Sequence, residues 1–249
     1  MNISKKILCR HSEIFLVLIL SLFFSSCNTD QASKTSFSST KQVCEKEPSG
    51  VVFIGDSNTA HLATYGLVDI DKILTGSESY MTLEPDVSNS FVVCTKAEKE
   101  MTVADALSLL NPEYAVISLG TDGAMSLDKE GVILSFSGLI ESIKAKAPKT
   151  LICLQTIPPV RQGHIGIRFH NVDAANRKFS LVNTWIKELS DKNGCIFIDS
   201  SAALCDSNGC LKAEYNTDHL DGYHLNRAGL STMLDSVYEA LNYQGESAK

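Results

Sequence analysis

Length, composition and charge narrow the possibilities before any motif is considered. The chain has 249 residues, of which 44% are hydrophobic and 20% are charged, and its formal net charge is −7. This length fits one α/β domain of ordinary size or two small ones, and the apolar fraction argues against a disordered chain. The acidic balance, with no run of lysine or arginine in the body of the chain, argues against nucleic acid as a partner. Eight cysteines in a chain this long do not indicate a disulfide-stabilised miniprotein.

The first residues have the features of an export signal. Three basic residues precede an apolar run over residues 14–24, which is shorter than the roughly 20 residues that span a bilayer. Two serines and then Cys27 follow, an arrangement that resembles a bacterial lipobox, in which the cysteine is lipidated and becomes the new N-terminus. We therefore expect a signal peptide over residues 1–26 and lipid attachment at Cys27. Phe24 departs from the usual lipobox leucine, so secretion without a lipid stays open.

The next segment has the composition of a flexible tether. Residues 27–49 are rich in serine, threonine, lysine and glutamine and contain almost nothing to bury. The folded domain is then expected over residues 50–249. Its acidic charge argues against a basic membrane-binding surface. We therefore expect membrane attachment only through the lipid anchor, on the outer face of the cell membrane, or plain secretion without it.

The body of the chain alternates predicted strands and helices. Short apolar runs, typical of strands buried on both faces, cover residues 51–54, 114–119, 151–157 and 196–198, and residues 91–93 form a weaker candidate. Helical spacing of apolar residues predicts a short helix that begins near Thr102 and is closed by Pro112, then helices over 131–147, around 182–189 and over 228–241. This alternation predicts an α/β fold with a three-layer, doubly wound parallel sheet, in which reactive groups gather at the carboxyl ends of the strands.

Three short blocks at those positions carry the candidate chemistry. Gly55-Asp56-Ser57 follows the first predicted strand, Gly120-Thr121-Asp122 follows the central one, and Asp221-Gly222-Tyr223-His224 precedes the last helix. A serine at a strand-to-helix turn exposes its hydroxyl, and a histidine base needs a carboxylate to hold its tautomer. Each block alone is also an ordinary turn sequence. Only their combination is specific.

Together the blocks resemble the SGNH, or GDSL-like, hydrolase superfamily, over residues 51–242. The resemblance implies a flavodoxin-like α/β fold, with Ser57 as the nucleophile, His224 as the general base and Asp221 orienting His224. It implies acyl transfer from an ester through an acyl-enzyme, without a metal or an organic cofactor. The expected partner is a small-molecule or carbohydrate ester.

The resemblance also implies an oxyanion hole with one unusual member. Its donors would be the Ser57 N–H, a glycine for which Gly76 is the nearest candidate, and the side chain of the third residue of the central block. The superfamily usually has asparagine there, whereas this chain has Asp122. An ionised carboxylate repels an oxyanion, and loss of one donor typically lowers the rate by about 10²–10³, unless burial keeps the carboxyl protonated. The sequence therefore predicts a slow or specialised esterase whose turnover rises in Asp122→Asn.

Other polar residues are given ordinary roles. Asp218 and His219 are expected to be surface loop residues, because a tetrahedral metal site is rarely formed by adjacent loop residues. Arg161 is expected to be solvated, with an anionic substrate group as the alternative partner. Asp56 is expected to cap the following helix.

The cysteines of the exported part cannot be paired from the sequence alone. Cys205 and Cys210 flank a turn-like segment and form the preferred disulfide. Cys153 and Cys195 lie on predicted strands, where a cysteine can equally be a small buried hydrophobic residue. Besides Cys27, the exported part contains Cys44, Cys94, Cys153, Cys195, Cys205 and Cys210.

Two classes of function remain at this stage. The first is a secreted or surface-tethered esterase that acts on small acyl esters, with O-acetyl groups on carbohydrate as one option. The second is a binding lipoprotein that kept the hydrolase fold and lost efficient catalysis, for which Asp122 would be the signature.

Overall fold

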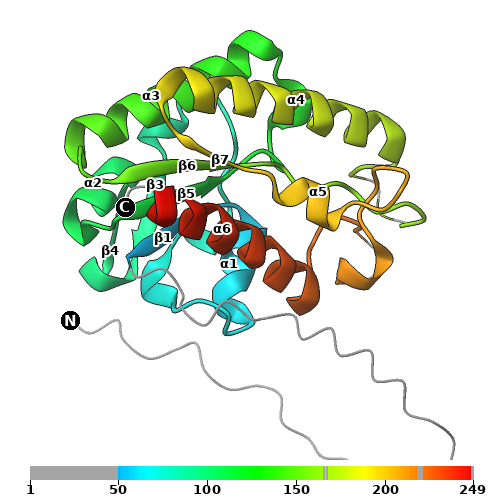
Figure 1. Cartoon of the computed structure of the whole chain (residues 1–249), viewed down its shortest axis with the longest axis horizontal. Helices are drawn as coiled ribbons and strands as arrows, with labels where there is room; N and C mark the ends of the chain where they lie inside the picture. Colours follow the sequence, from blue (N-terminus) through cyan, green and yellow to red (C-terminus); the bar gives the residue numbers. More distant parts are fainter. Residues whose placement is uncertain (1–49, 165, 167, 218–220, 248–249) are drawn as a thin grey trace, which may run out of the picture. The chain divides into compact units, whose positions relative to one another are not determined.

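A parallel sheet runs through the described part of the chain (Figure 1). The computed structural model describes residues 50–164, 166, 168–217 and 221–247, so the predictions on the signal peptide, Cys27, the tether, Cys44, Asp218 and His219 lie outside the described residues. The sheet has five strands in the order β2-β1-β5-β6-β7. They are β1 (Val51–Gly55), β2 (Ile73–Leu74), β5 (Tyr114–Ser118), β6 (Leu151–Gln155) and β7 (Ile196–Ile198).

The central strands are buried on both faces, as their continuous apolar sequences predict. Every residue of β1 and β5 is buried, and the two strands pair in parallel from Val51 opposite Tyr114 to Gly55 opposite Ser118. This register brings the ends of β1 and β5 to the same edge of the sheet. Loops that follow the two strands therefore start side by side.

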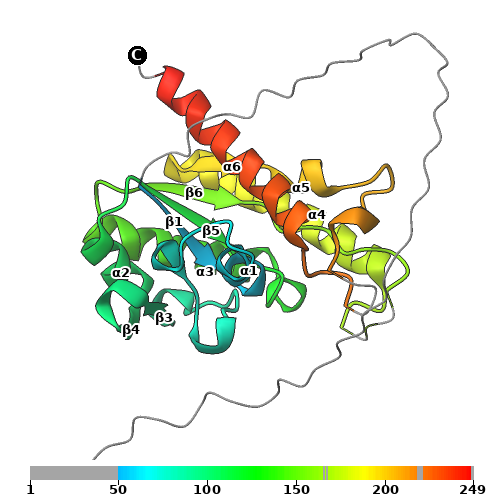
Figure 2. The ribbon, with the colours of Figure 1, turned by 90° about the horizontal axis from the view of Figure 1, so that it is seen from below.

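Helices cover both faces of the sheet and make three layers (Figure 2). One core contains the apolar faces of α2, α3 and α4 against one side of the sheet, and the other contains those of α1, α5 and α6 against the opposite side. This confirms the predicted three-layer α/β architecture. The helices are α1 (Ser57–Thr64), α2 (Val103–Leu110), α3 (Lys129–Lys146), α4 (Val172–Asn193), α5 (Ser200–Leu204) and α6 (Arg227–Ser247).

Side-chain caps fix where several helices begin. Each capping oxygen accepts a hydrogen bond from a backbone N–H of the first turn, which stabilises a helix start by about 1 kcal/mol. Thr102 caps α2 as the sequence predicts, and Asn111, with a left-handed backbone, ends that helix before Pro112. The other side-chain caps are Asp56 of α1, Asp128 of α3, Asn171 of α4 and Asp199 of α5.

The weaker strand candidate lies outside the central sheet. β3 (Phe91–Cys94) pairs with β4 (Lys99–Thr102) in an antiparallel hairpin. Its residues alternate between exposed and buried, which is the pattern of a strand with one solvated face. The sheet instead gains β2, which the sequence analysis missed because two residues are too few to show a periodicity. Short 3-10 turns link these elements: η1 (Ile70–Lys72), η2 (Ser77–Ser79), η3 (Val87–Asn89), η4 (Thr95–Ala97), η5 (Ala124–Ser126) and η6 (Ala213–Tyr215).

The predicted disulfide between Cys205 and Cys210 is wrong. All five cysteines in the described ranges are free thiols. The Cys205 sulfur lies 3.8 Å from Oγ of Ser201 within α5, whereas the Cys210 sulfur accepts a hydrogen bond from Nδ2 of Asn176 on α4 at 3.4 Å. The two sulfurs therefore contact different helices. Cys153 is fully buried on β6, which matches the alternative of a small buried hydrophobic residue.

Within the part of the chain that the structure describes, no helix is both long enough and apolar enough to cross a membrane.

Candidate active site

The turn from β1 into α1 presents Ser57 at the start of a helix. Gly55 ends β1, and a Cβ atom there would lie 2.3 Å from the Ser118 carbonyl oxygen of β5, so only glycine fits. Asp56 caps α1 by accepting a hydrogen bond from the Asn58 N–H at 3.1 Å, as the sequence analysis expects. Ser57 is thus the first residue of α1, where backbone N–H groups and the helix dipole favour negative charge.

The loop before α6 brings His224 and Asp221 to this serine. Ser57 Oγ lies 2.9 Å from Nε2 of His224, and His224 Nδ1 lies 2.6 Å from Oδ2 of Asp221. The carboxylate holds the ring with its proton on Nδ1, which leaves Nε2 to accept the serine proton. The three residues that the resemblance singles out are therefore in contact, in the order needed to activate a serine nucleophile.

Asp221 is held as a carboxylate by its own loop. Burial raises the pKa of Asp221, but hydrogen bonds from the His224 ring and from the backbone N–H groups of His224 and Tyr223 outweigh this and leave its pKa below the ordinary value. The two backbone bonds reach Oδ1 at 3.2 and 3.0 Å. Gly222 makes this tight loop possible, because its φ is +74° and a Cβ there would lie 2.5 Å from the His164 ring.

Two buried asparagines, which the sequence analysis missed, fix the backbone around His224. Asn58 donates from Nδ2 to the Tyr223 carbonyl at 3.3 Å and accepts from the Leu225 N–H on Oδ1 at 2.9 Å. Asn216 donates to the His224 carbonyl at 2.8 Å. Because Asn58 belongs to α1 and lies next to Ser57, it ties the nucleophile's helix directly to the loop that carries the histidine.

Arg161 supports the same loop from the other side. Its backbone N–H donates to the Gly222 carbonyl at 2.8 Å, and its Nη1 donates to Oδ1 of Asn216 at 3.4 Å. The side chain is half-buried. This arrangement differs from the solvated arginine that the sequence analysis expects, because the guanidinium bonds a buried asparagine that itself holds His224.

A second histidine lies beside the first. His61 is one helical turn after Ser57 on α1, and its ring centroid lies 5.1 Å from that of His224. Burial lowers the pKa of His61, the positive charge of His224 lowers it further, and Asp221 opposes the shift. Burial and the charge of His224 thus both favour the neutral form of the His61 ring. Spacing of four from Ser57 was the only sequence signal for this residue.

Gly76 follows β2, the edge strand that pairs with β1. A Cβ on Gly76 would lie 2.0 Å from the carbonyl oxygen of Tyr80, so a side chain is excluded there. The tight loop beyond it holds Glu78 and Ser79 with left-handed backbones at φ of 61° and 62°. Sheet order therefore places Gly76 and Ser57 at the ends of neighbouring strands, as an oxyanion role requires.

Asp122 follows β5 on the other side of β1, and its charge has a partner. The carboxylate is buried and forms an ion pair with the Arg168 guanidinium from the loop before α4. Arg168 could not be predicted from the sequence, because nothing in its local sequence marks it. An isolated carboxylate was the basis for expecting Asp122→Asn to raise turnover. With a cation in contact, that expectation no longer follows from the charge of Asp122 alone.

Asp56 is a buried acid in the same network. Burial raises its pKa, and the Asn58 N–H, a hydrogen bond from Thr121 and the positive charges of His224 and Arg168 act in the opposite direction. Thr121 belongs to the central block, so the turns after β1 and β5 are linked directly.

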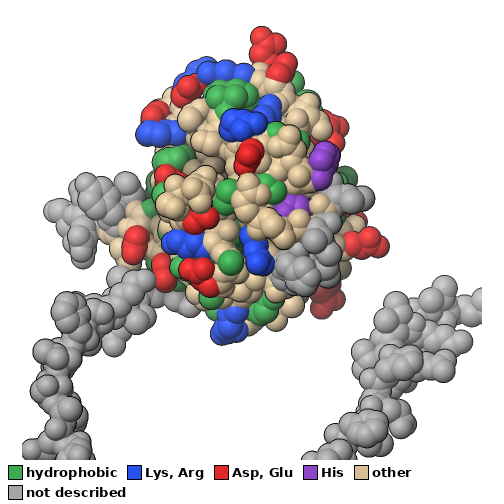
Figure 3. Space-filling view, turned by 90° about the vertical axis from the view of Figure 1, so that its right-hand side faces the viewer, with side chains coloured by type: hydrophobic (Ala, Val, Ile, Leu, Met, Phe, Trp, Pro, Cys, Tyr) green, Lys and Arg blue, Asp and Glu red, His purple; other side chains and the backbone are tan. Residues whose placement is uncertain are grey.

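Figure 3 shows the side of the domain on which α6 begins, where histidine side chains reach the surface among residues of both charges.

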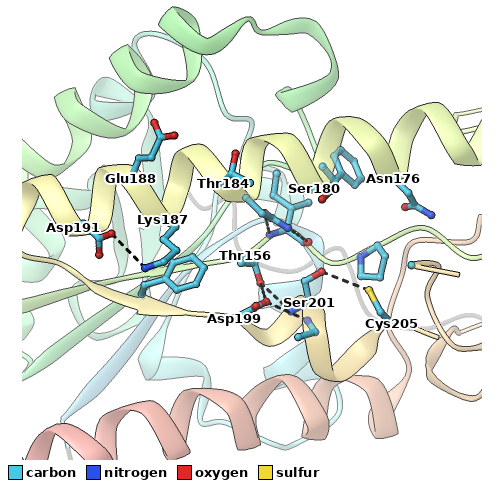
Figure 4. A pocket seen from close by; sticks show the side chains of 17 residues that line it. Thr156, Asn176, Ser180, Thr184, Lys187, Glu188, Asp191, Asp199, Ser201 and Cys205 are labelled. Atoms are coloured by element: carbon cyan, nitrogen blue, oxygen red, sulfur yellow. Dashed lines mark hydrogen bonds and ion pairs between the residues drawn. The ribbon is translucent and has the colours of Figure 1, made fainter. Parts of the chain in front are cut away.

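One cavity of the described part of the chain lies away from these residues. It has a volume of about 590 Å³ and opens between α4, β7 and α5 (Figure 4). Its lining includes Lys187 and Asp191, which pair with each other at 3.3 Å, and none of Ser57, Asp221 and His224 borders it.

In the described ranges, no group of three or more histidine, cysteine, aspartate or glutamate side chains is arranged to hold a metal ion.

Comparison with protein-family models identifies the family of the chain. Residues 53–230 match the model described as the GDSL-like lipase/acylhydrolase family. The chain belongs to this family. As a GDSL-like, or SGNH, hydrolase it is a carboxylic ester hydrolase, and the matched region contains all three blocks recognised in the sequence. No match was found among curated proteins.

Solved structures share the fold of this GDSL-like hydrolase at low sequence identity. A DUF4886 family protein from Bacteroides uniformis is 18% identical with a TM-score of 0.53, covering 78% of this chain and 82% of its own. A protein from Bacteroides fragilis provisionally named an acylhydrolase is 20% identical with a TM-score of 0.52, covering 78% and 86%. The periplasmic domain of a lipopolysaccharide acetyltransferase from Salmonella Paratyphi A is 17% identical with a TM-score of 0.50, covering 80% and 85%.

Proposed function

We propose that this GDSL-like hydrolase is an exported serine esterase that cleaves small acyl esters, O-acetyl groups on carbohydrate among them, through an acyl-enzyme on Ser57. The observation that carries the proposal is the continuous contact from Ser57 Oγ through the His224 ring to Asp221, at 2.9 and 2.6 Å. Membrane attachment, in this proposal, comes from a lipid on Cys27.

Each proton in the reaction has a carrier. Ser57 Oγ attacks the carbonyl carbon of the ester, and its proton passes to Nε2 of His224. Asp221 stabilises the imidazolium. The carbon–oxygen bond to the alcohol then breaks, and His224 returns the proton to the leaving alcohol. Water attacks the acyl-enzyme by the same route, which releases the acid and restores the Ser57 hydroxyl.

The negative charge that develops on the carbonyl oxygen needs donors at the strand ends. The Ser57 N–H lies at the start of α1, and Gly76 lies at the end of the neighbouring strand. Preorganised N–H groups of this kind stabilise a tetrahedral intermediate because they need no reorganisation during the reaction. Gly76 is proposed here as the second donor.

A fluorophosphonate probe tests the nucleophile directly. The wild-type protein should be labelled on Ser57 and should hydrolyse p-nitrophenyl acetate, and Ser57→Ala should lose both properties. Ser142→Ala serves as the matched control, because Ser142 lies on α3 and only donates a hydrogen bond to the Leu139 carbonyl. Failure of the wild-type protein to label would favour a binding lipoprotein that kept the fold and lost catalysis.

The lipid anchor needs a separate experiment. Cells that express the full chain should incorporate labelled fatty acid into the protein, and Cys27→Ser should abolish the incorporation and release the protein into the soluble exported fraction. An unlabelled wild-type protein found outside the cell would show plain secretion instead.

A further inference from the structure

The ion pair between Asp122 and Arg168 occupies a position where the superfamily usually has a neutral hydrogen-bond donor. The Asp122 side chain is 6% exposed, whereas that of Arg168 is 41% exposed. The carboxylate is therefore an internal charge and the guanidinium reaches it from the surface. A buried carboxylate without a cation is costly, and a guanidinium in contact offsets that cost.

This pair lies against both halves of the site. On one side, Thr121 next to Asp122 donates a hydrogen bond to Asp56, the residue before Ser57. On the other side, Arg168 Nη1 lies 3.5 Å from the Tyr223 hydroxyl, and its guanidinium stacks 5.1 Å above the Tyr223 ring. That ring lies 4.3 Å from the His224 ring. Two contacts with Tyr223 thereby hold Arg168 next to the catalytic loop.

The net charge of Asp122 and Arg168 determines whether they repel an oxyanion in the site. Asp122 alone would add a negative charge where the reaction creates another, and a low local dielectric strengthens that repulsion. With Arg168 in contact, the pair carries no net charge. Removal of the guanidinium uncovers the carboxylate, whereas removal of both charges recreates the asparagine that the superfamily resemblance implies.

We propose that Arg168 is the charge-compensating residue of the oxyanion site, which makes Asp122 compatible with ester hydrolysis in this chain. The inference rests on the proposed function, because it assumes acyl transfer at Ser57. Arg168 acts through Asp122 and is a positioning residue in this role. The charge of Arg168 explains how a carboxylate at position 122 is compatible with activity.

A double-mutant cycle tests the inference in the full chain with p-nitrophenyl acetate as the probe. Arg168→Ala should lower kcat by about 10²-fold or more, the size of an oxyanion-donor loss, with KM changed much less. Arg168→Ala combined with Asp122→Asn should recover most of that loss, and Arg168→Lys should retain most of the wild-type kcat. Arg177→Ala is the matched control, because Arg177 is an exposed arginine on α4.

Rescue by the double variant separates this role from a structural one, because lost packing would not return when Asp122 is also changed. A kcat of Arg168→Ala within threefold of wild type would overturn the inference, and so would a double variant no faster than Arg168→Ala. A wild-type protein that neither hydrolyses the ester nor labels with fluorophosphonate would refute the proposed function and this inference with it. An active wild type with an unaffected Arg168→Ala would refute this inference alone.

Discussion

Replacing Asn58 by alanine should damage stability and catalysis together, because one side chain holds the histidine loop onto the serine helix. Asn58 is 2% exposed, and its two hydrogen bonds reach the backbone on either side of His224. The substitution leaves the Leu225 N–H and the Tyr223 carbonyl without these partners. An unsatisfied buried group costs about 1–3 kcal/mol.

The two bonds differ in quality, which sets the expected size of the effect. The Leu225 bond, at 2.9 Å between buried groups, should account for most of the loss, and the 3.3 Å bond to the Tyr223 carbonyl for less. We expect a total of about 2–4 kcal/mol in the free energy of unfolding. For a domain of this size that lowers Tm by roughly 5–15 °C. Loosening of the His224 ring should lower kcat by about 10²-fold, as a displacement of about 1 Å does.

Asn183→Ala is the matched control for this experiment. Asn183 on α4 also binds one backbone N–H and one carbonyl, both of Ile157, at 2.8 and 3.1 Å. It should lose a comparable part of the stability while kcat stays within a few-fold of wild type, measured on p-nitrophenyl acetate at a temperature well below both Tm values. An Asn58→Ala variant with reduced Tm and unchanged kcat would refute the positioning role, as would an equal loss of kcat in Asn183→Ala.

Four further predictions concern the loop before α6 and one buried thiol. Asp221→Asn should lower kcat by about 10⁴, because the amide favours the wrong imidazole tautomer; a loss under tenfold would contradict this. The pKa of Asp221 is lower in the folded state than in the unfolded state, where it is about 3.9, so its carboxylate stabilises the fold above that pH. This stabilisation is lost as pH falls through the folded-state pKa. The free energy of unfolding should therefore depend less steeply on acid pH in Asp221→Asn than in the wild type. Gly222→Ala should lower both Tm and kcat, because its φ of +74° and the 2.5 Å approach to the His164 ring leave no room for a methyl group. Burial raises the pKa of Cys153 to about 12, so iodoacetamide at pH 8 should modify it only in urea, and rapid modification of the native protein would show that this strand is not buried.

The sequence predicted that the blocks after the first and central strands lie close together, because parallel strands bring their carboxyl ends to one edge of a sheet. The roles of Ser57 and His224 came from the resemblance of the three blocks to the SGNH superfamily, and their positions after β1 and before α6 agree with it. Asn58 directly follows Ser57 in the sequence, but its partners lie on the Tyr223–Leu225 backbone, and a contact over that sequence distance is decided by tertiary packing. Arg168 could not be found at all, since a loop without periodicity carries no signal of the charge it meets.

The errors have equally local causes. A turn-like segment between Cys205 and Cys210 indicated a bridge, but the direction of a thiol depends on the neighbours that each side chain meets, here Ser201 and Asn176. The strand predicted over residues 91–93 is confirmed as β3, but its apolar sequence does not indicate that it pairs with β4 outside the central sheet. The carboxylate of Asp122 in place of the usual asparagine was evident from the sequence. Its ion pair with Arg168 was not.

The separation of Ser57 and His224 by 167 positions has a consequence for how the active site assembles. Every strand of the central sheet precedes residue 199, so the base comes from a segment that follows the complete sheet in the chain. Ser57 acquires its proton acceptor only when the loop before α6 docks onto α1, which Asn58 holds through the Tyr223 carbonyl and the Leu225 N–H. Assembly of the site therefore depends on the C-terminal part of the domain.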